Sequence, residues 1–228
     1  MMTPLTESVQ FEIRRPARML LSRGEATGPL VIALHGYAMN APGMLDLTRQ
    51  LLGPGPVIAS LEAPNSFQLG RDPRTRECGY NWGTRETAEF HGDVHRQIVE
   101  GALGHLSRMY QAGPERFLLL GYSQSVGLNY RFIAANPGAV RGVLALVGGV
   151  PANWEESSAS IDASVYHISR AEDEFFPAAD VARFESRLRL RAADVEFQLL
   201  PGRHRFPLKS ATQVHQWIRR VYPSSTAP

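Results

Sequence analysis

The feature that most constrains the fold of this chain is an apolar run followed by a tight turn and a helix-like stretch. Residues 117–120 read Phe-Leu-Leu-Leu, as expected of a buried strand, and Gly-Tyr-Ser-Gln-Ser follows at 121–125. Residues 126–135 then carry a helix-like pattern. A serine on such a turn needs small neighbours two residues before and after it, because the turn is sterically tight. We therefore predict a nucleophile elbow at Ser123, with an ordinary strand-to-helix turn capped by serines as the alternative.

Apolar runs alternate with helix-like stretches along the chain. Residues 30–34, 57–61 and 143–147 are continuous apolar runs, as expected of buried strands, and residues 30–34 are typical of a strand covered on both faces. Residues 165–169 and 195–200 are also expected to form strands. Helix-like patterns cover residues 42–52, 91–110, 178–190 and 209–221. This alternation predicts an α/β fold with a mostly parallel central sheet and helices on both faces. We expect one domain over residues 1–222 and a disordered tail at residues 223–228.

Two parts of the chain are less regular. Residues 10–13 and 18–21 are expected to form a first antiparallel hairpin or edge strands. Residues 62–89 have no clean period, and we interpret them as a wall or partial lid over a site, with a solvated surface loop as the alternative. Guanidinium groups suit anionic head groups and carboxylates. That role is one hypothesis, beside simple solvation, for the arginines of this stretch, which are Arg71, Arg74, Arg76 and Arg85.

Composition narrows the classes of partner and compartment. The net charge is only +2, and no concentrated basic face is evident, so we expect no nucleic-acid partner. Cys78 is the single cysteine, so no internal disulfide can form. No apolar run approaches membrane-spanning length, and the first 23 residues lack a signal-peptide core. We expect a cytoplasmic protein without a transmembrane segment; its oligomeric state cannot be read from the sequence.

Reactive or polar side chains follow four of the predicted strands. His35, Ser123, Asp173 and His204 each stand in a loop just after a predicted strand. In open parallel sheets, sites gather outside the carboxyl ends of the strands. We therefore expect these four side chains to meet at one edge of the sheet.

Three of these residues have the chemistry of a catalytic triad. A serine hydroxyl is a poor nucleophile unless an imidazole accepts its proton and a carboxylate orients that imidazole. Ser123, Asp173 and His204 also occur in the chain order of α/β-hydrolases, which differs from the orders of chymotrypsin and subtilisin. The sequence thus predicts Ser123 as nucleophile, His204 as base and Asp173 as the acid.

Other residues compete for these roles. Glu172 and Glu174 flank Asp173, and either one is an alternative acid. His35 is interpreted as a hydrogen-bonding brace rather than a catalyst. The remaining histidines lie inside predicted helices or strands and are interpreted as solvated or packed; they are His91, His95, His105, His167 and His215.

An oxyanion hole needs two backbone N–H donors aimed at one point. By position, the residue after the nucleophile supplies one donor, here Gln124, and the loop after an early strand supplies the other, here Tyr37. No metal or cofactor is expected. His91 and His95 have i, i+4 spacing but no evident third ligand, and the chain has neither a dinucleotide-binding fingerprint nor a P-loop.

Taken together, these motifs resemble the carboxylesterase / lysophospholipase / acyl-protein thioesterase family of α/β-hydrolases, from about residue 30 to residue 218. The matching motifs are Leu34-His35-Gly36, Ala63-Pro64, Gly121-Tyr122-Ser123-Gln124, Leu146-Val147-Gly148-Gly149, Asp173 with Pro177, and Gly202-Arg203-His204. The resemblance implies the α/β-hydrolase fold and a cofactor-independent serine hydrolase. Its substrate would be a small-molecule ester or thioester, cleaved through an acyl-enzyme. Trp82, by likeness to an aromatic of the family's acyl pocket, and Phe176 are the candidate substrate-binding residues.

The chain also departs from that family. Ser125 stands where glycine is usual, Gly148 where serine is usual, and Arg170-Ala171-Glu172 where a histidine and a glycine are common. These departures leave the substrate open. One alternative is a hydrolase of lactones or peptides on the same fold, although a dienelactone-type enzyme normally carries cysteine at the elbow, which argues against it here. Another is a catalytically idle binding protein, against which the complete triad argues.

Overall fold

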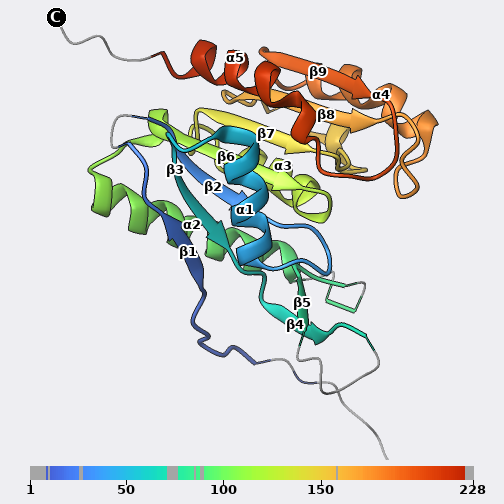
Figure 1. Ribbon diagram of the computed structural model, residues 1–228. Coiled ribbons are helices and arrows are strands. Elements are labelled where there is room, and N and C mark those ends of the chain that lie inside the picture. The colour runs from blue at the N-terminus through green and yellow to red at the C-terminus, as the bar shows by residue number, and fades with distance from the viewer. Residues whose placement is uncertain are drawn as a thin grey trace, which may run out of the picture.

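A seven-stranded sheet runs through the computed structural model (Figure 1). The structure describes residues 9, 11–25, 28–70, 77–84, 86–87, 90–157 and 159–223. The strand order is β1-β3-β2-β6-β7-β8-β9, in which β1 pairs antiparallel with β3 and every other neighbouring pair is parallel. The strands are β1 (Met19–Ser22), β2 (Leu30–Leu34), β3 (Val57–Leu61), β6 (Phe117–Tyr122), β7 (Gly142–Leu146), β8 (Ser164–Arg170) and β9 (Val195–Leu200).

Helices cover both faces of this sheet, which confirms the predicted α/β-hydrolase fold class. The helices α1 (Ala41–Leu52) and α5 (Ala211–Val221) pack on one face. The helices α2 (His91–Tyr110), α3 (Gln124–Ala135) and α4 (Ala178–Arg189) pack on the other. Short 3₁₀ turns lie at Pro114–Arg116, Trp154–Glu156 and Leu208–Ser210.

The two cores follow from the pleat of the strands. Leu30, Ile32 and Leu34 of β2 belong to the core beneath α2, α3 and α4. Val31 and Ala33 belong to the core beneath α1 and α5. Successive side chains of a strand point to opposite faces, so a strand that is apolar at every position serves two cores at once. The continuous apolar runs of the sequence are explained in this way.

Of the two alternatives expected for residues 10–13 and 18–21, the described residues support an edge strand and not a hairpin. Residues 18–21 do contribute an edge strand, β1, but its partner is β3, with Met19 opposite Leu61. Residues 11–18 form no strand, and Phe11 is 83% exposed, so its alternating pattern has no core to face.

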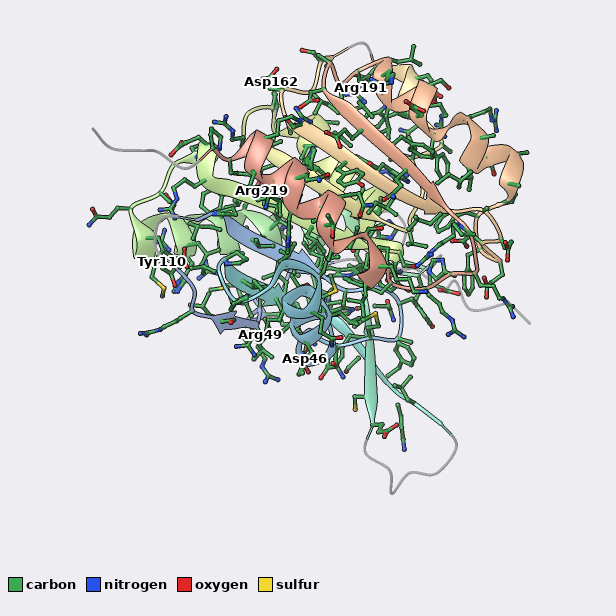
Figure 2. All side chains as sticks on the ribbon, turned by 45° about the horizontal axis from the view of Figure 1, so that its top comes forward. Asp46, Arg49, Tyr110, Asp162, Arg191 and Arg219 are labelled. Atoms are coloured by element: carbon green, nitrogen blue, oxygen red, sulfur yellow. The ribbon has the colours of Figure 1, made fainter. Side chains whose placement is uncertain are left out.

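The irregular stretch of residues 62–89 holds a small antiparallel pair, β4 (Asn65–Gln68) and β5 (Cys78–Asn81). Figure 2 shows this pair extending away from the body of the molecule. Arg71, Arg74, Arg76 and Arg85 lie outside the described residues, as do residues 224–228 of the predicted tail. No helix in the described ranges is long and apolar enough to cross a membrane.

Candidate active site

The three residues of the predicted triad meet at the carboxyl edge of the sheet. Ser123 follows β6, Asp173 follows β8 and His204 follows β9. Nε2 of His204 lies 2.8 Å from Oγ of Ser123. Nδ1 of the same ring lies 2.8 Å from Oδ2 of Asp173. The side chains of His204 and Asp173 are only 9% and 2% exposed, so water is largely excluded from their hydrogen bond.

Ser123 occupies a strained turn between β6 and α3. Its backbone has φ 55° and ψ −113°, a left-handed conformation that costs a non-glycine residue energy. The Ser123 N–H donates to the Leu146 carbonyl at 2.9 Å, which ties the turn to β7. The Ser123 side chain makes no capping hydrogen bond to α3, so the alternative of a capping serine is not supported. The local geometry is that of an elbow presenting its hydroxyl.

The two small residues that flank Ser123, Gly121 and Ser125, are explained by different contacts. A Cβ at Gly121 would lie 2.6 Å from Nδ2 of Asn129, so a side chain there is excluded. Ser125 is wholly buried, and its Oγ donates to the Leu34 carbonyl at 2.9 Å while accepting from the Tyr122 N–H at 3.0 Å. The serine that replaces the usual glycine therefore links the elbow to the end of β2.

The absence of a side chain at Gly148, where serine is usual, is explained by the packing of a neighbouring residue. A Cβ at this position would lie 2.4 Å from Cβ of Val126 and 2.6 Å from the Ser123 carbonyl oxygen. Val126 on α3 thus fills the space that a side chain of residue 148 would need.

The loop after β8 distinguishes the three competing carboxylates. Oδ1 of Asp173 accepts the N–H groups of Phe175 and Phe176 at 2.9 and 3.2 Å, which leaves Oδ2 for His204. Glu174 instead accepts the backbone N–H of His204 at 2.9 Å. Glu172 accepts the N–H of Gly202 at 3.3 Å. Asp173 alone of the three contacts the imidazole, and its two neighbours hold the backbone of the loop that carries it.

The hydrogen bonds at Glu174 also affect its ionisation. The N–H of His204 donates to this carboxylate and lowers its pKa, and Arg203 pairs with it at 3.1 Å. Glu174 therefore stays ionised while it holds the loop.

The two predicted oxyanion donors border Ser123. A Cβ at Gly36 would lie 3.1 Å from Cβ of Ser123, so the loop carrying Tyr37 touches the elbow. In the described part of the chain, no acceptor bonds the backbone N–H of Tyr37. The N–H of Gln124 opens α3 and has no intrahelical partner. Both N–H groups are thus available to a bound group.

His35 is buried and braces this loop. Its Nδ1 donates to the Gly36 carbonyl at 2.7 Å, and its Nε2 accepts from the Ala63 N–H at 3.1 Å. Burial lowers the pKa of His35, which keeps the ring neutral. The indole N–H of Trp82 donates to the His35 carbonyl at 2.8 Å. Both ring nitrogens and the main-chain carbonyl of His35 are therefore used for structure.

A cavity of about 320 Å³ opens beside Ser123. It is lined by Gly83, His91, Ser123, Gln124, Gly127, Leu128, Arg131, Gly149, Val150, Pro151 and Phe176. Phe176 forms part of the wall, and its ring lies over Gly149, where a Cβ would come within 2.8 Å of it. Trp82 does not line the cavity: its side chain is fully buried against the His35 loop, which corrects its expected role as a substrate contact.

The histidine pair on α2 is divided between core and cavity. His95 is buried, with Nε2 3.1 Å from Oδ1 of Asn129, and burial lowers its pKa to about 4. His91 lies on the cavity wall. Within the described ranges, no cluster of three or more His, Cys, Asp or Glu side chains could hold a metal ion.

The sequence interpretation missed most of the cavity wall. Gln124, Gly127, Leu128 and Arg131 line it with the spacing i, i+3, i+4 and i+7, which is one face of α3. That spacing, counted from the elbow, was the available signal.

Comparisons with known proteins agree with this fold. The model of the dienelactone hydrolase family matches residues 28–219. The structure resembles a carboxylesterase of Bacillus cereus (TM-score 0.69, 15% identity, covering 90% of this chain and 94% of that one). It also resembles esterase PE8 (TM-score 0.70, 20% identity, covering 90% of this chain and 98% of that one). A phospholipase/carboxylesterase of Dyadobacter fermentans is also similar (TM-score 0.69, 17% identity, covering 91% of this chain and 98% of that one). At these identities the structural likeness concerns the fold alone. No curated protein matches the sequence.

Proposed function

Since the chain belongs to the dienelactone hydrolase family, it is an α/β-hydrolase of the ester or lactone type, and we propose that it cleaves carboxylic esters or thioesters with Ser123 as nucleophile. The observation that carries the proposal is the continuous hydrogen-bonded chain from Ser123 through His204 to Asp173, with 2.8 Å at each step. Its position at a strained elbow adds support.

The first half-reaction forms an acyl-enzyme. Oγ of Ser123 attacks the substrate carbonyl while Nε2 of His204 takes the hydroxyl proton. Asp173 holds the proton on Nδ1 and stabilises the imidazolium that forms. The N–H groups of Tyr37 and Gln124 hydrogen-bond the carbonyl oxygen as it becomes an oxyanion. The tetrahedral intermediate collapses, His204 returns its proton to the leaving alcohol or thiol, and the acyl group stays on Ser123.

The second half-reaction repeats these roles with water. His204 takes a proton from a water molecule, which attacks the acyl carbonyl. The tetrahedral intermediate then expels Oγ of Ser123, which recovers a proton from His204, and the free acid leaves. Every proton transfer uses groups of this chain, so the scheme requires no cofactor.

Lactone hydrolysis is the second candidate, and the family match favours it. The same steps apply, except that the leaving alcohol stays tethered to the acyl group. A serine at the elbow does not separate this chain from the dienelactone hydrolases, contrary to the expectation from sequence. A panel of open-chain esters, thioesters, lactones and aminoacyl amides, compared by kcat/KM, separates these substrate classes.

The direct test compares wild type and Ser123→Ala on p-nitrophenyl esters of increasing acyl length. We expect the substitution to lower kcat by about 10⁴-fold or more. Ser186→Ala is the matched control, because this exposed hydroxyl on α4 bonds only the Arg183 carbonyl of its own helix. Circular dichroism verifies that the variants are folded. A folded Ser123→Ala protein with full activity contradicts the mechanism, and a wild type that neither hydrolyses esters nor reacts with a fluorophosphonate indicates an idle site.

A further inference from the structure

Two polar side chains of the cavity beside Ser123 are used neither by the proposed mechanism nor by a hydrogen bond among the described residues. Arg131 on α3 is exposed, and no carboxylate of the described residues pairs with it. Nδ1 of His91, the first residue of α2, is buried without a hydrogen-bond partner among those residues. The contact of His95 with Asn129 joins the two helices one turn from His91 and two residues from Arg131. Both side chains are therefore carried by packed helices.

The position of Arg131 follows from the face of α3 that forms the cavity floor. Gln124, Gly127, Leu128 and Arg131 share this face, which begins directly after Ser123. At a rise of about 1.5 Å per residue, Arg131 lies about 12 Å along the helix from Ser123. The Cα–Cβ bonds of a helix tilt toward its N-terminus, so the side chain of Arg131 leaves its backbone in the direction of the elbow. A cation thus stands at the far end of a groove that starts at the nucleophile.

None of the other described lining residues would neutralise the charge of Arg131. Among the residues that the structure describes, no acidic side chain lines the cavity. The side-chain amide of Gln124 already has hydrogen-bond partners. Its Oε1 accepts the backbone N–H of Trp82 at 3.1 Å, and its Nε2 donates to the Gly83 carbonyl at 2.9 Å. Leu128, Val150 and Phe176 are apolar. Apolar walls focus the field of a single charge.

The cavity lies on the acyl side of the nucleophile. In the proposed mechanism, His204 must deliver a proton to the leaving group, so that group lies on the His204 side of Ser123. The cavity lining includes Ser123 and Gln124 but not His204. The acyl part of a substrate therefore extends along α3 toward Arg131.

We propose, on the premise that Ser123 forms an acyl-enzyme, that this site selects esters whose acyl chain ends in a carboxylate. The guanidinium of Arg131 binds both carboxylate oxygens, a geometry that suits its planar fork. The ring of His91 lies on the same cavity wall. Apolar methylene groups of the acyl chain pack against Leu128, Val150 and Phe176 between the two ends.

The test pairs anionic and neutral substrates of equal chain length. The p-nitrophenyl hemiesters of adipic, pimelic and suberic acid are compared with p-nitrophenyl hexanoate, heptanoate and octanoate. We expect kcat/KM to favour at least one hemiester over its neutral partner by about tenfold, which corresponds to about 1.4 kcal/mol. The preference lies in KM, since the contact is made equally in the ground and transition states. It falls in about 1 M salt, where the Debye length is about 3 Å.

Three variants assign the preference to Arg131. Arg131→Gln lowers the ratio of anionic to neutral kcat/KM about tenfold, and Arg131→Lys, which keeps the charge but not the fork, retains part of the ratio. Arg219→Gln is the matched control and leaves the ratio unchanged. Arg219 is an exposed arginine of α5, on the opposite face of the sheet (Figure 2).

The outcomes separate this inference from the proposed function. Ser123-dependent hydrolysis of the neutral esters without any preference for hemiesters overturns the inference and leaves the proposed function standing. A preference that persists in Arg131→Gln also overturns it. If wild type hydrolyses no ester and Ser123 is not labelled by a fluorophosphonate, the proposed function fails, and the inference fails with it.

Discussion

The two sides of Ser123 are held in place by different kinds of interaction. On the oxyanion side, His35, Trp82 and Ser125 are fully buried and linked by neutral hydrogen bonds. On the base side, the exposed carboxylates of Glu172 and Glu174 hold the backbone of the His204 loop. A buried hydrogen bond between groups that stay neutral is not screened by salt, whereas an exposed carboxylate depends on pH and is screened by salt. The comparison therefore predicts that the hydrogen bonds on the two sides of Ser123 respond differently to pH and salt.

The largest loss of activity is expected on substitution of Asp173, the carboxylate that contacts the His204 ring. Asp173→Asn keeps the size of the side chain but removes the charge that fixes the tautomer of His204, so kcat falls by about 10⁴-fold. Steady-state kinetics on a p-nitrophenyl ester measures this loss. Asp180→Asn is the control, because this exposed carboxylate on α4 pairs only with Arg183. A loss of less than about tenfold at Asp173 would show that another acid orients the imidazole.

The next effect tests the buried side. Ser125→Ala removes the hydroxyl that links Tyr122 to the Leu34 carbonyl, leaving these backbone groups less satisfied. We expect about 1–3 kcal/mol of destabilisation in urea unfolding. The kcat value is expected to fall because the elbow and the oxyanion loop lose their link.

Thr48→Val is the matched control for Ser125→Ala. It deletes a buried hydroxyl on α1 that has no hydrogen-bond partner in the described part of the chain, so it is expected to leave stability equal or higher. Equal stability losses in both variants would remove the special role assigned to Ser125.

The smallest effect is expected at the exposed carboxylate. Glu174→Gln weakens the bond to the His204 N–H and the pair with Arg203, so kcat falls a few-fold and the loss shrinks in high salt. Because the folded state lowers the pKa of Glu174, its stabilising contribution is present above the ordinary glutamate pKa and is lost as the pH falls through the lowered value. The melting-temperature difference between wild type and Glu174→Gln is therefore expected at neutral pH and absent in acid; a difference independent of pH contradicts the comparison.

Much of the fold and the edge of the candidate site could be predicted from local patterns. Continuous apolar runs indicated a buried parallel sheet, and a sheet of this kind brings the ends of its strands together. Ser123, Asp173 and His204 needed only to follow predicted strands of this sheet to meet at one edge. The small residues around Ser123 were readable because a tight turn excludes large side chains locally.

What only the tertiary structure decided depends on contacts between distant segments. The choice of Asp173 over Glu172 and Glu174 depends on how two loops about thirty residues apart in sequence close on each other. Trp82 was expected to contact the substrate and His91 to be solvated or packed, yet Trp82 is buried against the His35 loop and His91 reaches the cavity. A linear sequence determines which side chains can pack or react. Which of them share a cavity is decided by the packing of α2, α3 and the loops around Ser123, because a cavity is a property of surfaces that meet only after folding.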